Sequence, residues 1–311
     1  MKSRVIFIFF GLTSLIVTEK ELYAKRPENL FKSAFLKSES GDRYGAIAVY
    51  TKAIELDPKN YDTYIYRGEA KQALGDFPGA IADYTLAIEL NPGKAAFYQF
   101  RGTCKGMLKD YEGAIADYTK AIEIEPEFPA TYYFRGGVKE NGIKDYSAAI
   151  ADYSRVIELD STDVSAYKSR GNAKFSLKDY TGAITDYTKT LELDPGDTDT
   201  YERRGDANSR LKNYTGAAAD FSKIIAIDEK NSEAYFRRGR LKLLLQDNYG
   251  ALTDLIEVIA LNPGHAAAYY LRGCVRQLLG DKPGAVADIM EGAKLGDTAA
   301  QKWLKSRKYS W

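Results

Sequence analysis

The dipeptide Arg-Gly recurs at a nearly fixed spacing along most of this 311-residue chain. The step between copies is 34 residues everywhere except for one step of 35, where segment 140–146 carries an extra residue. A period of this size is typical of arrays in which each unit is one supersecondary element. The seven copies begin at Arg67, Arg101, Arg135, Arg170, Arg204, Arg238 and Arg272.

Each unit has the pattern of a helix, a tight turn and a second helix. In 61–94, Gly75 follows the first apolar-periodic run and is suited to the left-handed conformation that ends a helix. Asn91-Pro92 then stops the second run. Such a pair cannot bury its apolar face alone, so we expect neighbouring pairs to stack into a solenoid. The predicted units are 27–60, 61–94, 95–128, 129–163, 164–197, 198–231, 232–265 and 266–299.

The motif residues resemble those of the tetratricopeptide repeat (TPR) family over roughly residues 27–299, in an Arg-Gly variant of bacterial type. The family pattern includes an early aromatic, a later Ala and a closing Pro. Two departures are systematic: Arg replaces the Leu before Gly, and Lys or Arg usually replaces the second aromatic. The matching residues are Tyr64, Tyr98, Tyr132, Tyr167, Tyr201, Tyr235 and Tyr269, then Ala46, Ala80, Ala114, Ala149, Ala183, Ala217, Ala251 and Ala285, and finally Pro58, Pro92, Pro126, Pro195 and Pro263.

The expected fold is therefore an all-α, right-handed superhelical solenoid of eight tandem repeats over 25–299. Residues 300–311 are predicted to form a capping helix, in which Trp303 and Leu304 close the last open face. The resemblance further implies that the first helix of each repeat lines a concave surface, where a partner binds as an extended peptide or a helix.

The first 24 residues differ from the rest. Lys2 and Arg4 precede the mostly apolar segment 5–17, a length that suits a secretory signal and is short for a membrane span. We expect export to the periplasm or exterior, with cleavage after Ala24. An uncleaved membrane anchor and a buried segment remain the alternatives, and only an uncleaved anchor would contact a membrane.

A carboxylate recurs on the apolar stripe of the second helix, in the same seven repeats that have the Arg. Repeat one lacks both, with Ser33 and Val49 at the equivalent positions. This joint absence predicts that each Arg pairs with the Asp of its own repeat, because pairing between repeats would orphan Arg67 and Asp288. The alternative, a charged binding track, is disfavoured because a ligand site need not be identical in seven repeats. The expected partners are Asp83, Asp117, Asp152, Asp186, Asp220, Asp254 and Asp288.

Partner binding is expected where the repeats differ, at the second, fifth, sixth and ninth residues of each first helix. Repeats one to four supply apolar candidates, namely Phe31, Phe35, Ile65, Tyr66, Phe100, Tyr133 and Phe134. Repeats five to seven supply Lys168, Asn172, Arg203, Arg237 and Arg240. We expect an apolar anchor on the aromatics and an acidic or C-terminal carboxylate segment on the Arg residues, along one continuous surface. The alternative is that some aromatics only pack against the neighbouring repeat.

Residues for catalysis are scarce. His265, the only histidine, is expected in a solvated loop, and one His with two distant Cys cannot form a Cys/His zinc site. Cys104 and Cys274 are too far apart in a stacked array for a disulfide, so free thiols are expected. The balance of 44 basic against 43 acidic residues argues against nucleic acid.

The sequence thus favours a non-enzymatic protein-interaction scaffold that needs no cofactor or metal. The alternatives are an exported envelope protein that binds glycan or acts as an enzyme through an unrecognised pocket, and an RNA-reading helical repeat. Neutral charge and export disfavour the last.

Overall fold

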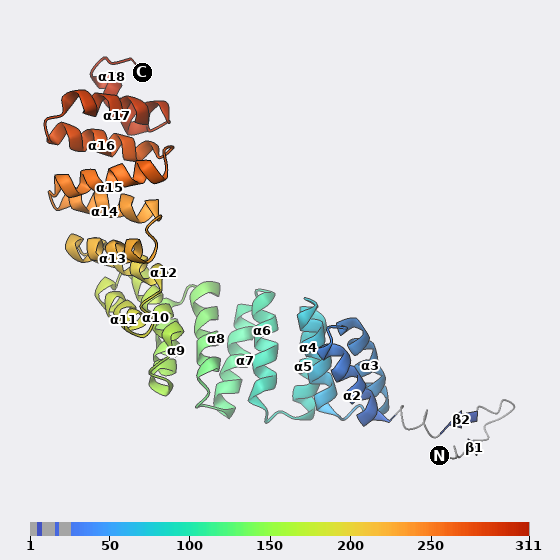
Figure 1. Ribbon diagram of the computed structural model, residues 1–311. Helices are drawn as coiled ribbons and strands as arrows, with labels where there is room; N and C mark the ends of the chain where they lie inside the picture. The colour runs from blue at the N-terminus through green and yellow to red at the C-terminus, as the bar shows by residue number, and fades with distance from the viewer. Residues whose placement is uncertain (1–4, 8–15, 19–25, 311) are drawn as a thin grey trace. The chain divides into compact units, whose positions relative to one another are not determined.

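The computed structural model describes residues 5–7, 16–18 and 26–310 (Figure 1). Strands β1 (Val5–Phe7) and β2 (Ile16–Thr18) pair antiparallel, with Ile6 opposite Val17. Most of the predicted export signal, 1–24, lies outside the described residues. No helix in the described part of the chain has the length and apolar character needed to span a membrane.

The helical part divides into two units, one ending at Ser161 and the other beginning at Thr162. The first contains α2 (Pro27–Glu39), α3 (Arg43–Leu56), α4 (Tyr61–Ala73), α5 (Phe77–Leu90), α6 (Ala95–Met107), α7 (Tyr111–Ile124), α8 (Pro129–Gly137), the π-helix η1 (Val138–Gly142) and α9 (Tyr146–Leu159). The second contains α10 (Val164–Ser176), α11 (Tyr180–Leu193), α12 (Thr198–Arg210), α13 (Tyr214–Ile227), α14 (Ser232–Leu244), α15 (Asn248–Leu261), α16 (Ala266–Leu278), α17 (Lys282–Lys294) and α18 (Thr298–Ser306).

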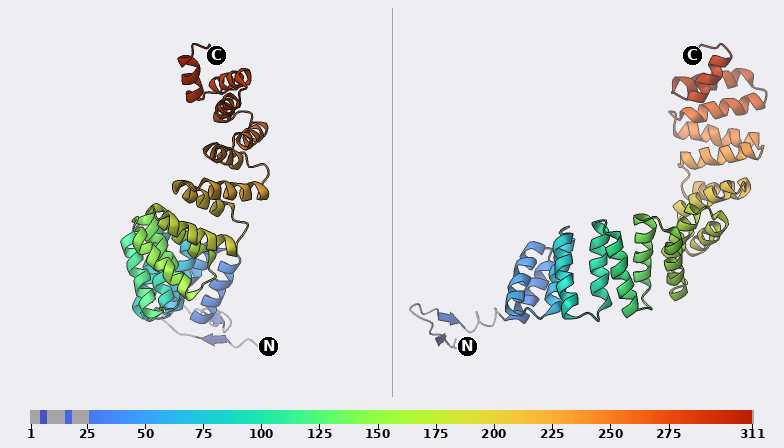
Figure 2. Two further views of the ribbon diagram at one scale, coloured as in Figure 1. Left: turned by 90° about the vertical axis from the view of Figure 1, so that its left-hand side faces the viewer. Right: turned by 180° about the vertical axis from the view of Figure 1, so that it is seen from behind.

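Each first helix packs against the second helix of its own repeat, and within each unit that second helix packs against the next first helix. Figure 2 shows this order clearly for α14 to α17. Every first helix begins at the first residue of its predicted repeat. The result is an all-helical solenoid. At its C-terminal end α18 begins at Thr298, two residues before the predicted capping helix, and buries Leu304 completely.

Local sequence explains where the second helices begin. Each follows a capping side chain that accepts a hydrogen bond of 2.9–3.1 Å from the backbone N–H three residues later. Short polar side chains at this position satisfy N–H groups that have no partner inside the helix. The caps are Asp42, Asp76, Asp110, Asp145, Asp179, Asn213, Asp247 and Asp281.

The turn between the two helices of a repeat contains a residue with positive φ. Gly75 has φ 80°, as its position after the first helix predicts. Five of the other repeats place a longer side chain there, for example Lys178 with φ 64°. The left-handed conformation is thus required by the turn even where no glycine is present.

The extra residue of repeat four is accommodated in η1, directly after α8. A π-helical turn bonds each residue to the fifth along and so holds one residue more than an α-helical turn. The remainder of the repeat keeps its geometry, since Asp145 still caps α9.

Candidate interaction surface

The Arg of each Arg-Gly dipeptide binds the Asp of its own repeat in all seven repeats. The Arg Nη2 lies 2.5–2.7 Å from one carboxylate oxygen. Nε donates to the carboxylate at 2.9–3.1 Å, so the contact is bidentate. The Asp side chains are at most 6% exposed. The intra-repeat pairing expected from the sequence is therefore present.

A second donor completes each site, at the position where the family pattern has its second aromatic, and it is a cation in six of the seven repeats. Lys71, for example, lies 2.8 Å from the Asp83 carboxylate. Lys105, Lys139, Lys174, Lys242 and Arg276 make the equivalent contact at 2.8–2.9 Å, and Asn208 donates to Asp220 at 3.2 Å. The aromatic is replaced because the buried Asp needs a second donor. The sequence showed the replacement but not its purpose.

The same Arg side chains also connect neighbouring repeats. Arg67 Nη1 donates to the Thr51 hydroxyl of repeat one at 3.1 Å. Arg101, Arg135, Arg204 and Arg238 make the same bond to a Thr or Ser of the preceding repeat at 2.9–3.1 Å. Each of the seven guanidinium groups also lies 5.4–5.8 Å from the ring of the Tyr three residues earlier. We call this set of Arg, Asp, second donor and hydroxyl the Arg–Asp ladder.

The apolar candidates of the first unit form packed aromatic contacts. Tyr66 lies edge-on to Phe31 at 5.2 Å and to Phe35 at 5.6 Å. Ile65 is only 6% exposed and belongs to the core, so it is not available to a partner in this structure. This corrects its assignment to the binding surface, and the alternative of packing against a neighbour holds for this residue.

Phe100, Tyr133 and Phe134 differ in accessibility. Phe100 is half-buried against Tyr84, with ring centroids 5.6 Å apart. Phe134 is 50% exposed and stacks on Tyr118 at 6.2 Å, while Tyr133 contacts it edge-on. Phe134 is therefore the better candidate for an apolar anchor.

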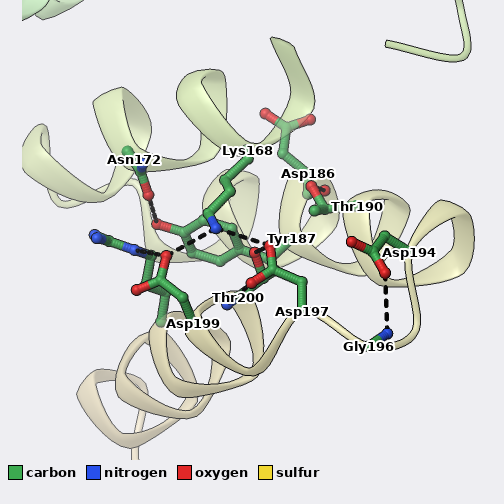
Figure 3. A network of polar contacts seen from close by, with 11 residues as sticks. Lys168, Asn172, Asp186, Tyr187, Thr190, Asp194, Gly196, Asp197, Asp199 and Thr200 are labelled. Atoms are coloured by element: carbon green, nitrogen blue, oxygen red, sulfur yellow. Dashed lines mark hydrogen bonds and ion pairs between the residues drawn. The ribbon is translucent and has the colours of Figure 1, made fainter. Parts of the chain in front are cut away.

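The polar candidates of repeats five and six are already paired with carboxylates and hydroxyls of this chain (Figure 3). Lys168 lies 2.8 Å from Asp197 and 2.9 Å from Asp199, and Arg203 donates to Asp199 at 2.9 Å. Asn172 accepts a hydrogen bond from Tyr187. Burial opposes ionisation of Asp199, but the hydrogen bonds from Arg203 and Lys168 outweigh it and lower the pKa of that carboxyl.

The two arginines of repeat seven have different surroundings. Arg237 lies 2.5 Å from Glu202, also contacts Asp206, and covers the Phe221 ring at 4.7 Å. Arg240 is exposed and lies 5.8 Å from the Phe236 ring. Among the five polar candidates, Arg240 is the cation for which the described residues provide no carboxylate.

A pocket of about 370 Å³ opens beside these two arginines. Its walls come from α12, α13, α14 and α16, all in the second unit. Apolar side chains predominate in the lining, which includes Tyr214, Phe221, Leu241, Leu244 and Leu271. The sequence pointed to Arg237 and Arg240 but not to this pocket, because three repeats contribute to it.

The remaining candidates for chemistry have structural environments. His265 caps α16, with Nδ1 accepting from the Ala268 N–H at 3.2 Å, and lies 4.4 Å from the Phe236 ring. His265 thus lies in the loop between α15 and α16, as expected, but it is half-buried and has a capping role that the sequence did not indicate. Cys104 and Cys274 are free, and burial raises the pKa of the Cys104 thiol to about 11. Within the described residues, no group of three or more His, Cys, Asp or Glu could hold a metal ion.

The geometry defines a helical-repeat solenoid, and sequence comparison identifies its repeats. Tetratricopeptide repeat models match residues 27–60, 95–128, 49–82 and 164–197. The chain therefore contains tetratricopeptide repeats. Comparison with curated proteins gives no match.

Solved structures show the same fold. The C-terminal part of a TPR repeat-containing protein from Cytophaga hutchinsonii is 21% identical, with a TM-score of 0.69 over 76% of this chain and 97% of that chain. The MamA protein is 25% identical, with a TM-score of 0.52 over 54% of this chain and 92% of that chain. YrrB, described as a TPR protein with an unusual peptide-binding site, is 23% identical, with a TM-score of 0.53 over 61% and 97%.

Proposed function

We propose that this protein is a non-enzymatic interaction scaffold that binds a protein or peptide segment on the concave surface of its first helices. One observation carries the proposal: repeats two to eight agree at the Arg–Asp pair and differ at the exposed positions of the same first helices. The ladder binds its own Asp and neighbouring hydroxyl groups, so it is occupied by the fold. The variable side chains remain for recognition.

The exposed variable positions have the chemistry of an interface. Phe134 presents an aromatic face next to Tyr133 in the first unit, and the second unit has the pocket beside Arg237 and Arg240. Aromatic and Arg side chains are enriched among the residues that dominate interface energies. The shared fold with other TPR proteins supports a protein or peptide as the partner.

Specificity for an acidic or C-terminal carboxylate segment is the finer part of the proposal. Lys168, Arg203 and Arg237 already contact carboxylates of the chain, so a ligand carboxylate would have to compete for them. Arg240 can bind a ligand carboxylate without first losing an ion pair to another described residue. Binding to an acidic segment should therefore weaken as salt screens the charge.

Site-specific photocrosslinking tests the proposed surface. A benzophenone side chain is placed at Phe134 on α8, and the matched control is placed at Leu86 on α5, a second helix, where the native side chain is 40% exposed. In extracts of the native organism, we expect adducts of discrete mass from position 134 and not from position 86. Adducts from position 86 alone would move the interaction to the second helices.

Export is a separate proposal and rests on the sequence of residues 1–24. The basic start and the apolar segment 5–17 support a cleaved signal. The intact mass of the native protein, isolated from the cell envelope or the medium, should equal that of a chain that begins at Lys25. A chain with Met1 retained in the cytosol would contradict this.

A further inference from the structure

The pocket in the second unit combines a mostly apolar lining with Arg240, an exposed cation for which the described residues provide no carboxylate at ion-pair distance. Tyr214 and Phe221 of α13 and Leu241 of α14 line it, and Leu271 of α16 borders it from the next repeat. At about 370 Å³ it lies in the lower part of the size range for ligand pockets, roughly 300–1,000 Å³. This space accommodates a bulky apolar side chain with some of its backbone.

The charges around the pocket distinguish two roles. Arg237 forms ion pairs with Glu202 and Asp206 and lies over the Phe221 ring, so it lines the pocket without a free charge for a ligand. Arg240 also lines the pocket and is exposed, and its guanidinium lies 5.8 Å from the Phe236 ring. An exposed guanidinium without a carboxylate can pair with an incoming acid without breaking an existing ion pair.

The apolar character continues beyond the pocket. Leu244, at its mouth, is 58% exposed, and Leu278 occupies the same repeat position one repeat later and is 67% exposed. Exposed apolar surface next to a lined pocket is typical of an interaction site. Because the apolar surface extends along two first helices, an extended chain fits it better than a compact ligand.

We propose that this pocket takes a bulky apolar side chain of an extended peptide, and that a nearby carboxylate of the same peptide pairs with Arg240. The proposal rests on the proposed scaffold function and names its ligand chemistry in the second unit. In this proposal Arg240, and not Arg237, binds the carboxylate of the peptide. Arg237 instead packs over Phe221 and forms part of the pocket wall. The carboxylate belongs to an Asp or Glu side chain or to the peptide C-terminus.

A display library of random 12-residue peptides provides the probe, selected on the purified protein. We expect enriched peptides in which Leu, Phe or another bulky apolar residue lies within a few positions of an acid. The best peptide is then synthesised, and its affinity is measured by fluorescence anisotropy at two salt concentrations. Helical circular dichroism checks that each variant has folded.

Charge reversal separates a binding role from a structural one. Arg240→Glu should weaken binding about tenfold or more at low salt, and less at high salt. A second peptide, with Lys in place of the acid, should bind Arg240→Glu better than it binds the parent protein. Lys223→Glu, an exposed site on α13, is the matched control and should change affinity less than about twofold.

The apolar half has its own pair of variants. Leu244→Asp should weaken binding of the same peptide, whereas Ile227→Asp on α13, where Ile227 is 50% exposed, should not. Unchanged affinity in Arg240→Glu would overturn the inference, as would enriched peptides that lack either feature. So would binding of a fluorescent dodecanoate probe without any peptide enrichment. These results test the pocket alone. The crosslinking experiment at Phe134 tests the scaffold function independently of them.

Discussion

Repeats one and two follow the same helix-turn-helix plan, but only the second contains the Arg–Asp pair. Repeat one has Ser33 and Val49 where repeat two has Arg67 and Asp83. Both repeats bury a tyrosine completely in the second helix. The Tyr84 hydroxyl donates to Gln72 at 2.8 Å, whereas the buried Tyr50 hydroxyl has no hydrogen-bond partner among the described residues.

Repeat one nevertheless keeps the part of the ladder that its neighbour uses. Thr51 accepts from Arg67 and itself donates to the Ile47 carbonyl at 2.8 Å. Repeat seven shows the opposite case, because Ile256 occupies the equivalent position before Arg272 and offers no hydroxyl. The ladder is therefore organised between repeats as well as within them, and its two parts can be lost separately.

The largest effect is expected from Asp83→Ala in repeat two. It leaves Arg67 and Lys71, whose side chains are 14% and 19% exposed, without their carboxylate. Removing one partner of such a buried network costs about 3–5 kcal/mol. The matched change in repeat one, Val49→Ala, removes two carbons and should cost about 1–2 kcal/mol. Native-state hydrogen exchange of α3, α4 and α5 measures both, and equal losses would show that the network adds no stability.

A smaller loss is expected from Gly68→Ala. A Cβ at this position would lie 2.6 Å from Cε1 of the buried Tyr84 ring, so the two helices must separate or the ring must shift. Overpacking of this kind costs about 1–3 kcal/mol. Repeat one natively has Ala34 at the same position, and Ala34→Gly should cost only about 0.5–1 kcal/mol. Thermal unfolding of both variants compares the two losses of stability. If the Tyr84 ring can move aside, Gly68→Ala should cost no more than Ala34→Gly.

Thr51→Val isolates the contact between repeats one and two. It removes the hydroxyl that accepts from Arg67 while Arg67 keeps Asp83, so the expected loss in the free energy of unfolding is about 1 kcal/mol. The control is Thr253→Val, because among the described residues the exposed Thr253 hydroxyl bonds to the Tyr249 carbonyl of its own helix and to no other repeat. Urea denaturation compares them. A loss no greater than the control would mean that the ladder acts only inside repeats.

The smallest effect, a gain, is expected from Lys178→Gly. Lys178 has φ 64°, and glycine adopts this conformation without the Cβ clash, although it is more flexible in the unfolded chain. The net gain should be about 0.5 kcal/mol. The reverse change, Gly75→Lys at φ 80°, should lose a similar amount. Opposite signs in urea denaturation support this reading, and equal signs exclude it.

Much of the fold could be predicted because the repeats form an alignment inside one chain. The spacing of Arg-Gly places the start of each first helix, and the joint loss of Arg and Asp in repeat one predicts which residues pair. The inter-repeat hydroxyl could have been found in the same way, since Thr or Ser precedes the Arg by sixteen residues in six repeats. The second cation was visible as a departure from the family pattern.

The candidate surface was harder to predict because it depends on which neighbours each side chain reaches. Positions on a helix face identify Lys168 and Arg237, but not the carboxylates near the neighbouring helix that already pair with them. Arg203 pairs within its own helix, with Asp199. Likewise, position alone does not distinguish the half-buried Phe100 from the exposed Phe134. The pocket depends on the distances between three repeats, which no single repeat encodes.

The π-helical turn at Val138–Gly142 has a consequence for how such a chain can change. Arg135 and Asp152 are separated by 17 residues rather than 16, but the Arg135 Nε and Nη2 bonds to Asp152 are 3.0 and 2.6 Å. An insertion that would shift the phase of every later residue is absorbed within one turn. A single added codon therefore does not disable the array, and this allows gradual variation in repeat length alongside duplication of whole units.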